Sequence, residues 1–259
     1  MSYVDLHLHL LPGVDDGAKD ERDALTYARR LAQEGVREVT VTPHISPAWK
    51  LDVASIPGRV AALQRLIDEQ RLGVRLHAGG ELHPSRALDL TDAELAVLAQ
   101  GPVGSRWLLL ETPFSGVDEK FAAVCDGLRA RGYGLVIAHP ERAGNLLEDG
   151  GLDLLRAQLG AGAVLQINVC SLLGNHGLRI QETAVHLLRN GLSYAIASDA
   201  HPGTRGHTLR LGFELALRAG ASSVQAWHLT QANPRFLLRM GIPHAPSPAT
   251  AAALELLLD

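Results

Sequence analysis

The sequence has little of several residue types, and each shortage excludes a class of protein. Only two of its 259 residues are cysteine, Cys125 and Cys170, which is too few for a disulfide-stabilised fold. Aromatic residues make up 4%, so Leu, Val, Ile and Ala are expected to fill the core. The net charge of -4 gives no reason to expect a nucleic acid or an anionic membrane as a partner.

Long apolar runs are also lacking. The best one, Ala249 to Leu258, is too short to cross a membrane and contains Glu255. The first residues lack the basic region and the apolar run of a signal peptide, so we expect a cytoplasmic protein without membrane insertion. No G-x-x-x-x-G-K-[ST] motif occurs, which argues against ATP hydrolysis of the P-loop kind.

What the sequence does have is an alternation of short apolar runs with segments of helical periodicity. The runs are often β-branched and almost continuously apolar, which is typical of strands covered on both faces. Parallel strands require crossover connections, so the alternation predicts a parallel sheet in one α/β domain spanning 1–259. Alternation alone does not decide whether the sheet closes into a barrel. The candidate strands are Val4–His9, Glu38–Thr42, Val74–Ala78, Trp107–Glu111, Gly134–Ala138, Ala163–Asn168 and Tyr194–Ala197.

Helices are expected wherever apolar residues recur at helical spacing between acidic starts and glycine stops. A closing helix is also expected within 243–259, after a proline-rich turn. The other expected helices lie within 19–36, 119–134, 178–194, 206–220 and 222–241, the last as one or two helices.

Polar residues gather at the carboxyl ends of the predicted strands, where parallel β/α folds build their active sites. His7 and His9 are two apart on a strand, so both side chains point to the same side. They precede Asp15 and Asp16 in a turn flanked by glycine, where one of the two acids can serve the turn itself.

Glu81 and Glu111 each end an apolar strand, where an unpaired carboxylate is costly to bury. A metal ion would balance either charge, and so would a salt bridge. Asp199 and His201 share one side if their strand continues. The full set of candidate metal ligands is His7, His9, Asp16, His44, Glu81, Glu111, His139, Asp199 and His201.

These nitrogen and oxygen ligands exceed what one tetrahedral site requires and suit two or three divalent ions, with Mn, Fe, Zn or Mg favoured because thiolates are absent. Clustered ions suit displacement at phosphorus. Arg142 and Arg205 lie beside the ligands in sequence, and a guanidinium matches phosphate oxygens bidentately. Solvation at the surface is the alternative for both arginines. Asn168 is expected to bond a ligand or to cap a turn.

The remaining candidates are weaker. Cys125 precedes Arg131 at a spacing used by cysteine phosphatases, but the segment lies in a predicted helix, so both cysteines are interpreted as packing residues. The other histidines are interpreted as surface or core residues; they are His77, His83, His176, His186, His207, His228 and His244.

The ordered motifs DLHLHLLPGVDDGAKD, VTPH, GGEL, LLLETP, VIAHPER and IASDAH resemble the PHP (polymerase and histidinol phosphatase) superfamily. More narrowly, they resemble the manganese-dependent protein-tyrosine phosphatases of bacterial capsular and exopolysaccharide loci, over about Tyr3 to Arg239. The resemblance implies a distorted (β/α)7 barrel with a trinuclear site. It also implies a substrate, the phosphorylated tyrosine-rich tail of a cognate autokinase.

By matching motif positions, the resemblance assigns the ligands to ions. One ion is held by His7, His9, Glu81 and Asp199; a second by Glu81, Glu111 and His139; and a third by Asp16, His44 and His201. Arg142 and Arg205 match arginines that contact the phosphate. Either Asp199 or His201 is a candidate to relay a proton to the leaving group.

Three rival functions remain at this point. A small-molecule phosphatase of the same superfamily, such as a histidinol phosphatase, has the same kind of site. An amidohydrolase also begins with His-x-His, but it usually carries a carboxylated lysine at a later strand end, and none of Lys19, Lys50 and Lys120 occupies one. The third rival is a binding module with a degenerate site.

Overall fold

The structure is built around parallel strands. It is a computed structural model that describes residues 2–144, 146–148 and 150–242. One parallel sheet contains β1 (Tyr3–Leu8), β2 (Val36–Val41) and β4 (Arg75–Ala78). A second contains, in this order, β3 (His44–Ile45), β5 (Glu81–Leu82), β6 (Trp107–Glu111), β7 (Gly134–Ala138), β8 (Val164–Asn168) and β9 (Ser193–Ala197).

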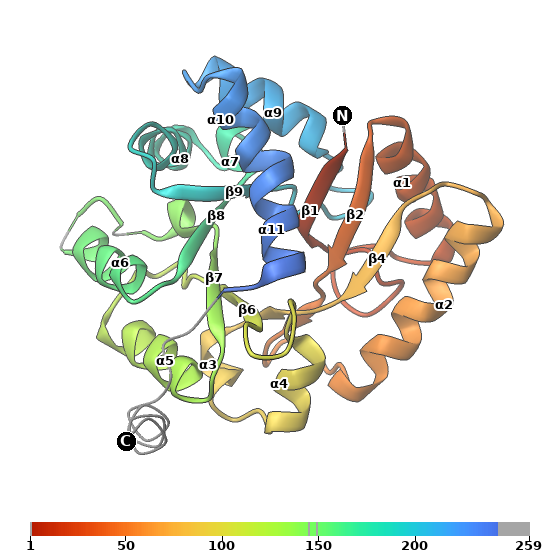
Figure 1. Ribbon diagram of the computed structural model, residues 1–259, viewed down its shortest axis with the longest axis horizontal. Coiled ribbons are helices and arrows are strands. Elements are labelled where there is room, and N and C mark those ends of the chain that lie inside the picture. Colours follow the sequence, from red (N-terminus) through yellow and green to blue (C-terminus); the bar gives the residue numbers. More distant parts are fainter. Residues whose placement is uncertain (1, 145, 149, 243–259) are drawn as a thin grey trace, which may run out of the picture.

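The two sheets join into one ring (Figure 1). β3 continues the path of β2 beyond Pro43, and β5 continues that of β4 beyond Gly79–Gly80, so each pair is one interrupted strand. On the other side the backbone N–H of Asp199, just past β9, donates to the carbonyl of His7 in β1 at 2.9 Å. The predicted distorted barrel of seven strands is therefore confirmed, with two of its strands interrupted.

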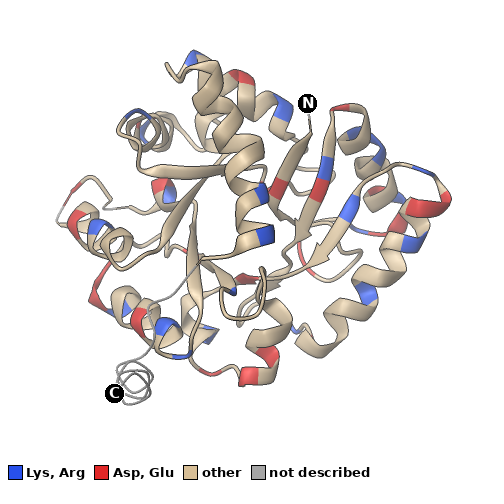
Figure 2. Ribbon diagram, viewed as in Figure 1, with Lys and Arg blue, Asp and Glu red and all other residues tan. Residues whose placement is uncertain are grey.

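Helices surround this ring (Figure 1). Asp20 and Asp118 cap α1 (Glu21–Gln33) and α5 (Glu119–Ala130) by accepting hydrogen bonds from Asp23 N and Phe121 N, which satisfies backbone donors that helices leave free. Charged residues of both signs are spread over the outer helices (Figure 2). The helices around the strands are α1 (Glu21–Gln33), α2 (Ile56–Glu69), α3 (Pro84–Ala87), α4 (Asp92–Leu98), α5 (Glu119–Ala130), α6 (Gly151–Gly160), α7 (Val169–Leu173), α8 (Leu178–Arg189), α9 (Leu209–Arg218) and α10 (Ser223–Trp227).

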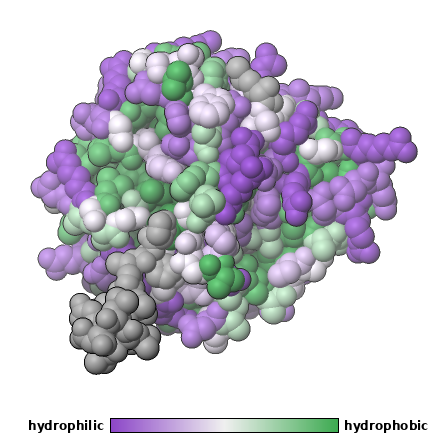
Figure 3. All heavy atoms as spheres, viewed as in Figure 1, coloured by the Kyte–Doolittle hydropathy of each residue, from purple (hydrophilic) through white to green (hydrophobic). Residues whose placement is uncertain are grey.

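The last helix of the described residues, α11 (Asn233–Met240), covers the amino end of the barrel (Figure 1). It follows α10 through a π-helical turn, His228–Ala232, and crosses in front of the strands in Figure 1. The indole N–H of Trp107, the first residue of β6, donates to the carbonyl of Leu237 at 2.9 Å. On this face hydrophobic patches lie between hydrophilic side chains (Figure 3). The carboxyl ends of the strands therefore lie at the end of the barrel away from α11.

Two apolar clusters hold the barrel together. The larger lies between the strands and the surrounding helices. The smaller contains Val4 from β1, Leu109 from β6, Val136 from β7 and Leu237 from α11. β1 pairs with neither β6 nor β7, so these side chains meet across the barrel interior. This smaller cluster thus fills the amino end of the barrel with apolar side chains, and their burial stabilises the barrel whose strand ends carry the polar residues.

The expected helices appear close to their predicted positions, and the segment 222–241 forms α10 and α11 with the π-helical turn between them. The closing helix predicted within 243–259 lies outside the described residues. Within the described ranges, every helix is too short or too polar to cross a membrane.

Candidate metal centre

The strand ends bring the predicted ligands together at the carboxyl end of the barrel. Three groups of side chains place one potential ligand atom each within 4.8 Å of the others. The groups are His9, Asp16, His44 and His201; His7, His9 and Glu81; and His44, Glu81 and Glu111. His139 and Asp199 border the same groups. All nine predicted ligands therefore lie in one cluster, although they come from strands far apart in the sequence.

Glu81 lies at the centre of this cluster. Its Oε1 lies 2.8 Å from Nε2 of His139 and 3.4 Å from Nε2 of His7. Its Oε2 lies 2.8 Å from Nδ1 of His44 and 3.4 Å from Nε2 of His9. The side chain is 1% exposed and has no arginine or lysine partner among the ion pairs of the described residues. The salt-bridge alternative for Glu81 is therefore not observed there.

The hydrogen-bond partners of His7 and His9 suit a cation between the two rings. Nδ1 of His9 lies 2.8 Å from the carboxylate of Asp15, which can only accept, so Nδ1 carries the proton. Nδ1 of His7 lies 3.0 Å from Oε1 of Gln166. A metal ion between the rings would take the lone pairs of both Nε2 atoms, which lie only 3.3 Å apart. Without an ion, the carboxylates around His9 favour its protonated form instead.

Asp199 adds a second carboxylate to this group. Its Oδ1 lies 3.5 Å from Nε2 of His7 and 3.4 Å from Nε2 of His9. Although burial opposes it, hydrogen bonding to Asp15, Asp199 and Glu81 raises the pKa of His9 well above its usual value. The cluster thus attracts positive charge strongly, which is what a divalent ion supplies.

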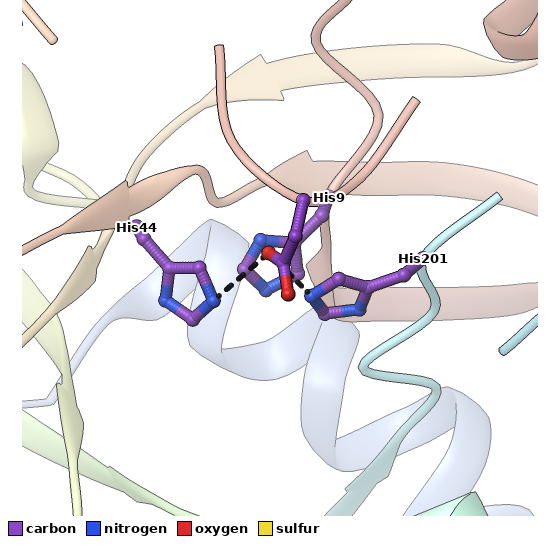
Figure 4. Close-up of side chains that lie close together, drawn as sticks. His9, His44 and His201 are labelled. Carbon is purple, nitrogen blue, oxygen red and sulfur yellow. Dashed lines mark ion pairs between the residues drawn. The ribbon is translucent and has the colours of Figure 1, made fainter. Parts of the chain in front are cut away.

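Asp16, His44 and His201 form the outer part of the cluster, beside His9 (Figure 4). Oδ1 of Asp16 lies 3.3 Å from Nε2 of His44 and 3.2 Å from Nε2 of His201. The rings of His9 and His201 stack with centroids 3.9 Å apart. The Asp16 side chain is 51% exposed, so this part of the cluster faces solvent and a substrate can reach it.

Two predicted ligands have unusual backbone conformations. His139 has φ 37° and Asp199 has φ 46°, in the left-handed region that side chains other than glycine rarely adopt. β9 ends at Ala197, as predicted, and the chain turns at Asp199. The condition under which Asp199 and His201 would share one side of a continuing strand is therefore not met. Strain of this kind is typical of functional sites, because the surroundings must hold it in place.

Arg142 and Arg205 both face Asp199. Nη1 of Arg142 lies 3.4 Å from its Oδ2, and Nη2 of Arg205 lies 3.5 Å from its Oδ1. Arg205 also lies against His201, with 2.8 Å between Nη2 and Nδ1. The surface-solvation alternative is thereby disfavoured, because both guanidinium groups point into the cluster rather than into water.

A polar network from β8 supports the ligands. Asn168 donates to Oδ2 of Asp199 at 2.7 Å, so it bonds a predicted ligand rather than merely capping a turn. Gln166 donates to Asn168 at 2.7 Å and faces His7. Glu141 is fully buried and accepts from the backbone N–H of Asn168 at 2.8 Å. Neither Gln166 nor Glu141 was predicted. Gln166 does leave a signal, because it alternates with Asn168 at the end of the apolar strand β8.

His176, which was interpreted from the sequence as a surface or core histidine, is partly buried. Its Nε2 atom is buried and has no hydrogen-bond partner among the described residues. Burial, together with the positive charges of Arg142 and Arg205, lowers its pKa to about 4. His176 therefore stands neutral beside the two arginines.

Both cysteines are buried, as expected for packing residues. Cys125 is buried within α5, and burial raises the pKa of its thiol to about 12. Cys170 is buried in α7, and burial raises its pKa to about 11. Neither thiol forms a thiolate near neutral pH, so cysteine-based phosphoryl transfer has no nucleophile here.

Comparison with known proteins agrees with this geometry. A family model described as capsular polysaccharide synthesis, CpsB/CapC, matches residues 3–238. The chain belongs to the CpsB/CapC family. CapC of Staphylococcus aureus, provisionally named a tyrosine-protein phosphatase, is 30% identical over 201 residues, which is 76% of each chain. The tyrosine-protein phosphatase YwqE of Bacillus subtilis is 29% identical over 199 residues, 76% of this chain and 77% of YwqE.

A solved CpsB/CapC structure has the same fold. It comes from a pair described as unique metal-dependent tyrosine phosphatases, YwqE from Bacillus subtilis and CpsB from Streptococcus pneumoniae. The TM-score is 0.77 at 26% identity, and the match covers 95% of this chain and 99% of the other. The histidine and carboxylate groups found here suit the metal dependence stated for that pair.

Proposed function

We propose that this member of the CpsB/CapC family is a metal-dependent protein-tyrosine phosphatase. The observation that carries the proposal is the convergence of nine candidate ligands with two arginines at the carboxyl end of one barrel. The tyrosine phosphatase activity stated for the relatives supports the choice of substrate. A cytoplasmic location, with a tyrosine autokinase tail in capsule or exopolysaccharide synthesis as substrate, completes the proposal.

These side chains are proposed to hold two or three divalent ions, with manganese as the first candidate before iron, zinc or magnesium, because mixed imidazole and carboxylate ligation suits it. His7, His9, Glu81 and Asp199 would hold one. Glu81 would be shared with a second ion held by Glu111 and His139, and its two oxygens do face different histidines. Asp16, His44 and His201 would hold the third. Bound ions lower the pKa of water and offset charge on the phosphoryl oxygens.

The protein's own groups then position the substrate. Arg142 and Arg205 donate N–H groups to the phosphoryl oxygens and fix the ester for displacement in line. Asp15 and Gln166 hold the imidazoles of His9 and His7 in the tautomer that presents Nε2 to the site. Asp199 or His201 is proposed to relay a proton. A tyrosine leaving group needs little help, because its phenol has a pKa of about 10.

Turnover tests this proposal directly. Metal-stripped protein is given Mn, Zn or Mg separately and assayed on a phosphotyrosine peptide, beside a His139→Ala variant. We expect activity only after metal is restored, and none in the variant.

Other outcomes identify the rivals. Release of phosphate from histidinol phosphate but not from the peptide would indicate a small-molecule phosphatase. If neither substrate is hydrolysed although metal is bound, the phosphatase proposal is contradicted, and other hydrolase activities become the next candidates. Capture of a kinase that survives metal removal, without turnover, would favour a binding module.

A further inference from the structure

An aromatic side chain stands at the edge of the metal centre. Phe114 follows β6 three residues after Glu111 and is 52% exposed. Its ring centroid lies 5.9 Å from that of His139. A single exposed apolar residue is common on protein surfaces. This one differs, because it touches two residues of the candidate site.

Arg142 joins the ring of Phe114 to the site. Its Cζ atom lies 4.3 Å from the centroid of the Phe114 ring, which is the distance of a cation–π contact. The same guanidinium reaches Asp199, with 3.4 Å between Nη1 and Oδ2. Arg142 therefore contacts both the ring and Asp199, so a phosphoryl group held by Arg142 would lie beside Phe114.

Hydrogen bonds hold the backbone around Phe114 in position. The N–H of Gly144 donates to the carbonyl of Phe114 at 3.0 Å, and Arg179 donates to the carbonyl of Gly144 at 2.8 Å. A turn with 3.0 Å between Gly116 N and Pro113 O closes the loop itself. The segment that carries Arg142 thus fixes the segment that carries Phe114, so the ring is oriented before substrate arrives.

We propose that Phe114 recognises the aromatic ring of the substrate, so that the site prefers aryl phosphate esters to alkyl phosphate esters. This inference rests on the proposed function and names its source of specificity. Aromatic pairs attract beyond the area they bury, through edge-to-face or offset contact. Phosphotyrosine carries such a ring next to its phosphate, whereas phosphoserine carries only a methylene group.

Two small ligands isolate the effect of the ring. Phenylphosphonate and methylphosphonate share the anionic group and differ only in the substituent. Calorimetry on the Mn-loaded protein should show phenylphosphonate binding about tenfold more tightly. Phe114→Ala should remove this preference without changing the affinity for methylphosphonate, and Phe114→Tyr should keep it. The matched control is Phe236→Ala, since Phe236 is 49% exposed on α11 at the other end of the barrel (Figure 1).

The outcomes distinguish recognition of the substrate ring by Phe114 from a role in which Phe114 only supports Arg142. If Phe114 only supports Arg142, Phe114→Ala weakens both phosphonates equally, and the inference is overturned. Equal affinities in the unaltered protein overturn it as well. Failure of the proposed function looks different: the phosphotyrosine peptide is not hydrolysed, while the preference for phenylphosphonate persists. If neither phosphonate binds, the phosphate site itself is absent and both proposals fail.

Discussion

The Nδ1 atom of His9 lies 2.8 Å from Oδ2 of Asp15, and the same oxygen accepts from the backbone N–H of His44 at 3.0 Å. One buried carboxylate thus orients two of the proposed ligands without being one itself. Asp15 also accepts from Gly17 N at 3.0 Å, and its bond to His9 lowers its pKa against the effect of burial. It therefore stays ionised and keeps the proton of His9 on Nδ1.

Asp15→Asn should weaken metal binding while leaving the fold intact. An amide is a weaker acceptor than a carboxylate and can present its NH₂ group to His9, so the ring loses its fixed tautomer. Changes to groups that orient ligands cost about 10- to 100-fold in metal affinity. Competition with a chelator measures this affinity. Asp89→Asn, at an exposed position, is the control, and an unchanged affinity in Asp15→Asn would contradict the supporting role.

Glu81→Gln should remove more metal than Glu111→Gln. Glu81 belongs to two of the three ligand groups and Glu111 to one. Both changes keep the shape of the side chain, so the difference reports ligation rather than packing. Mass spectrometry of the metal content after gel filtration gives the number of ions per chain. Equal losses in the two variants would show that Glu81 is not shared between ions.

The sequence predicts the strands of the barrel better than the breaks within two of them. Runs such as Trp107–Glu111 and Gly134–Ala138 match β6 and β7 residue for residue, because strands buried on both faces are continuously apolar. Pro43 and Gly79–Gly80 mark the ends of β2 and β4 in the sequence. Only pairing with neighbouring strands shows that the chain resumes as β3 and β5 after these breaks.

The cluster of proposed ligands was predictable for a related reason: histidines and acids at the ends of apolar strands stand out. Gln166 alternates with Asn168 at such a strand end, but its contact with His7, like the contact of Glu141 with Asn168, joins distant segments and appears only in the fold. Asp15 shows the same limit. Its sequence context suits a turn, and the turn bond to Gly17 exists, but its contact with His9 appears only once β1 and the following loop are folded together.

Gly17→Ala should destabilise the loop that carries Asp15 and Asp16. A Cβ atom at this position would overlap the backbone carbonyl of His9 and lie 2.6 Å from its Cβ. Overpacking of this kind costs about 1–3 kcal/mol in the free energy of unfolding. Urea unfolding measures the change. Gly58→Ala is the control, since nothing lies within 4 Å of its added Cβ in α2, and it should stabilise by about 0.5–1 kcal/mol.

Arg142→Lys should lower kcat/KM on a phosphotyrosine peptide without removing metal. A lysine keeps the charge but cannot present two parallel N–H groups to the phosphoryl oxygens. Loss of one such donor costs about 10²- to 10³-fold in rate. Arg156→Lys, on the exposed side of α6, should leave the rate unchanged. A rate that falls only in proportion to metal content would place Arg142 in support of the metal ligands instead.

His176 should stay neutral down to about pH 4, whereas a histidine in the unfolded chain titrates near 6.5. Burial is the main cause, and the charges of Arg142 and Arg205 add to it. Because the unfolded chain then binds more protons, the free energy of unfolding should fall as pH drops from 6.5 towards 4. NMR titration of the ring in the Mg-loaded protein measures the pKa directly. Arg142→Ala should raise that pKa, and His176→Gln should lose less stability over the same interval; a titration near 6.5 in the folded protein would show that His176 faces water rather than the arginines.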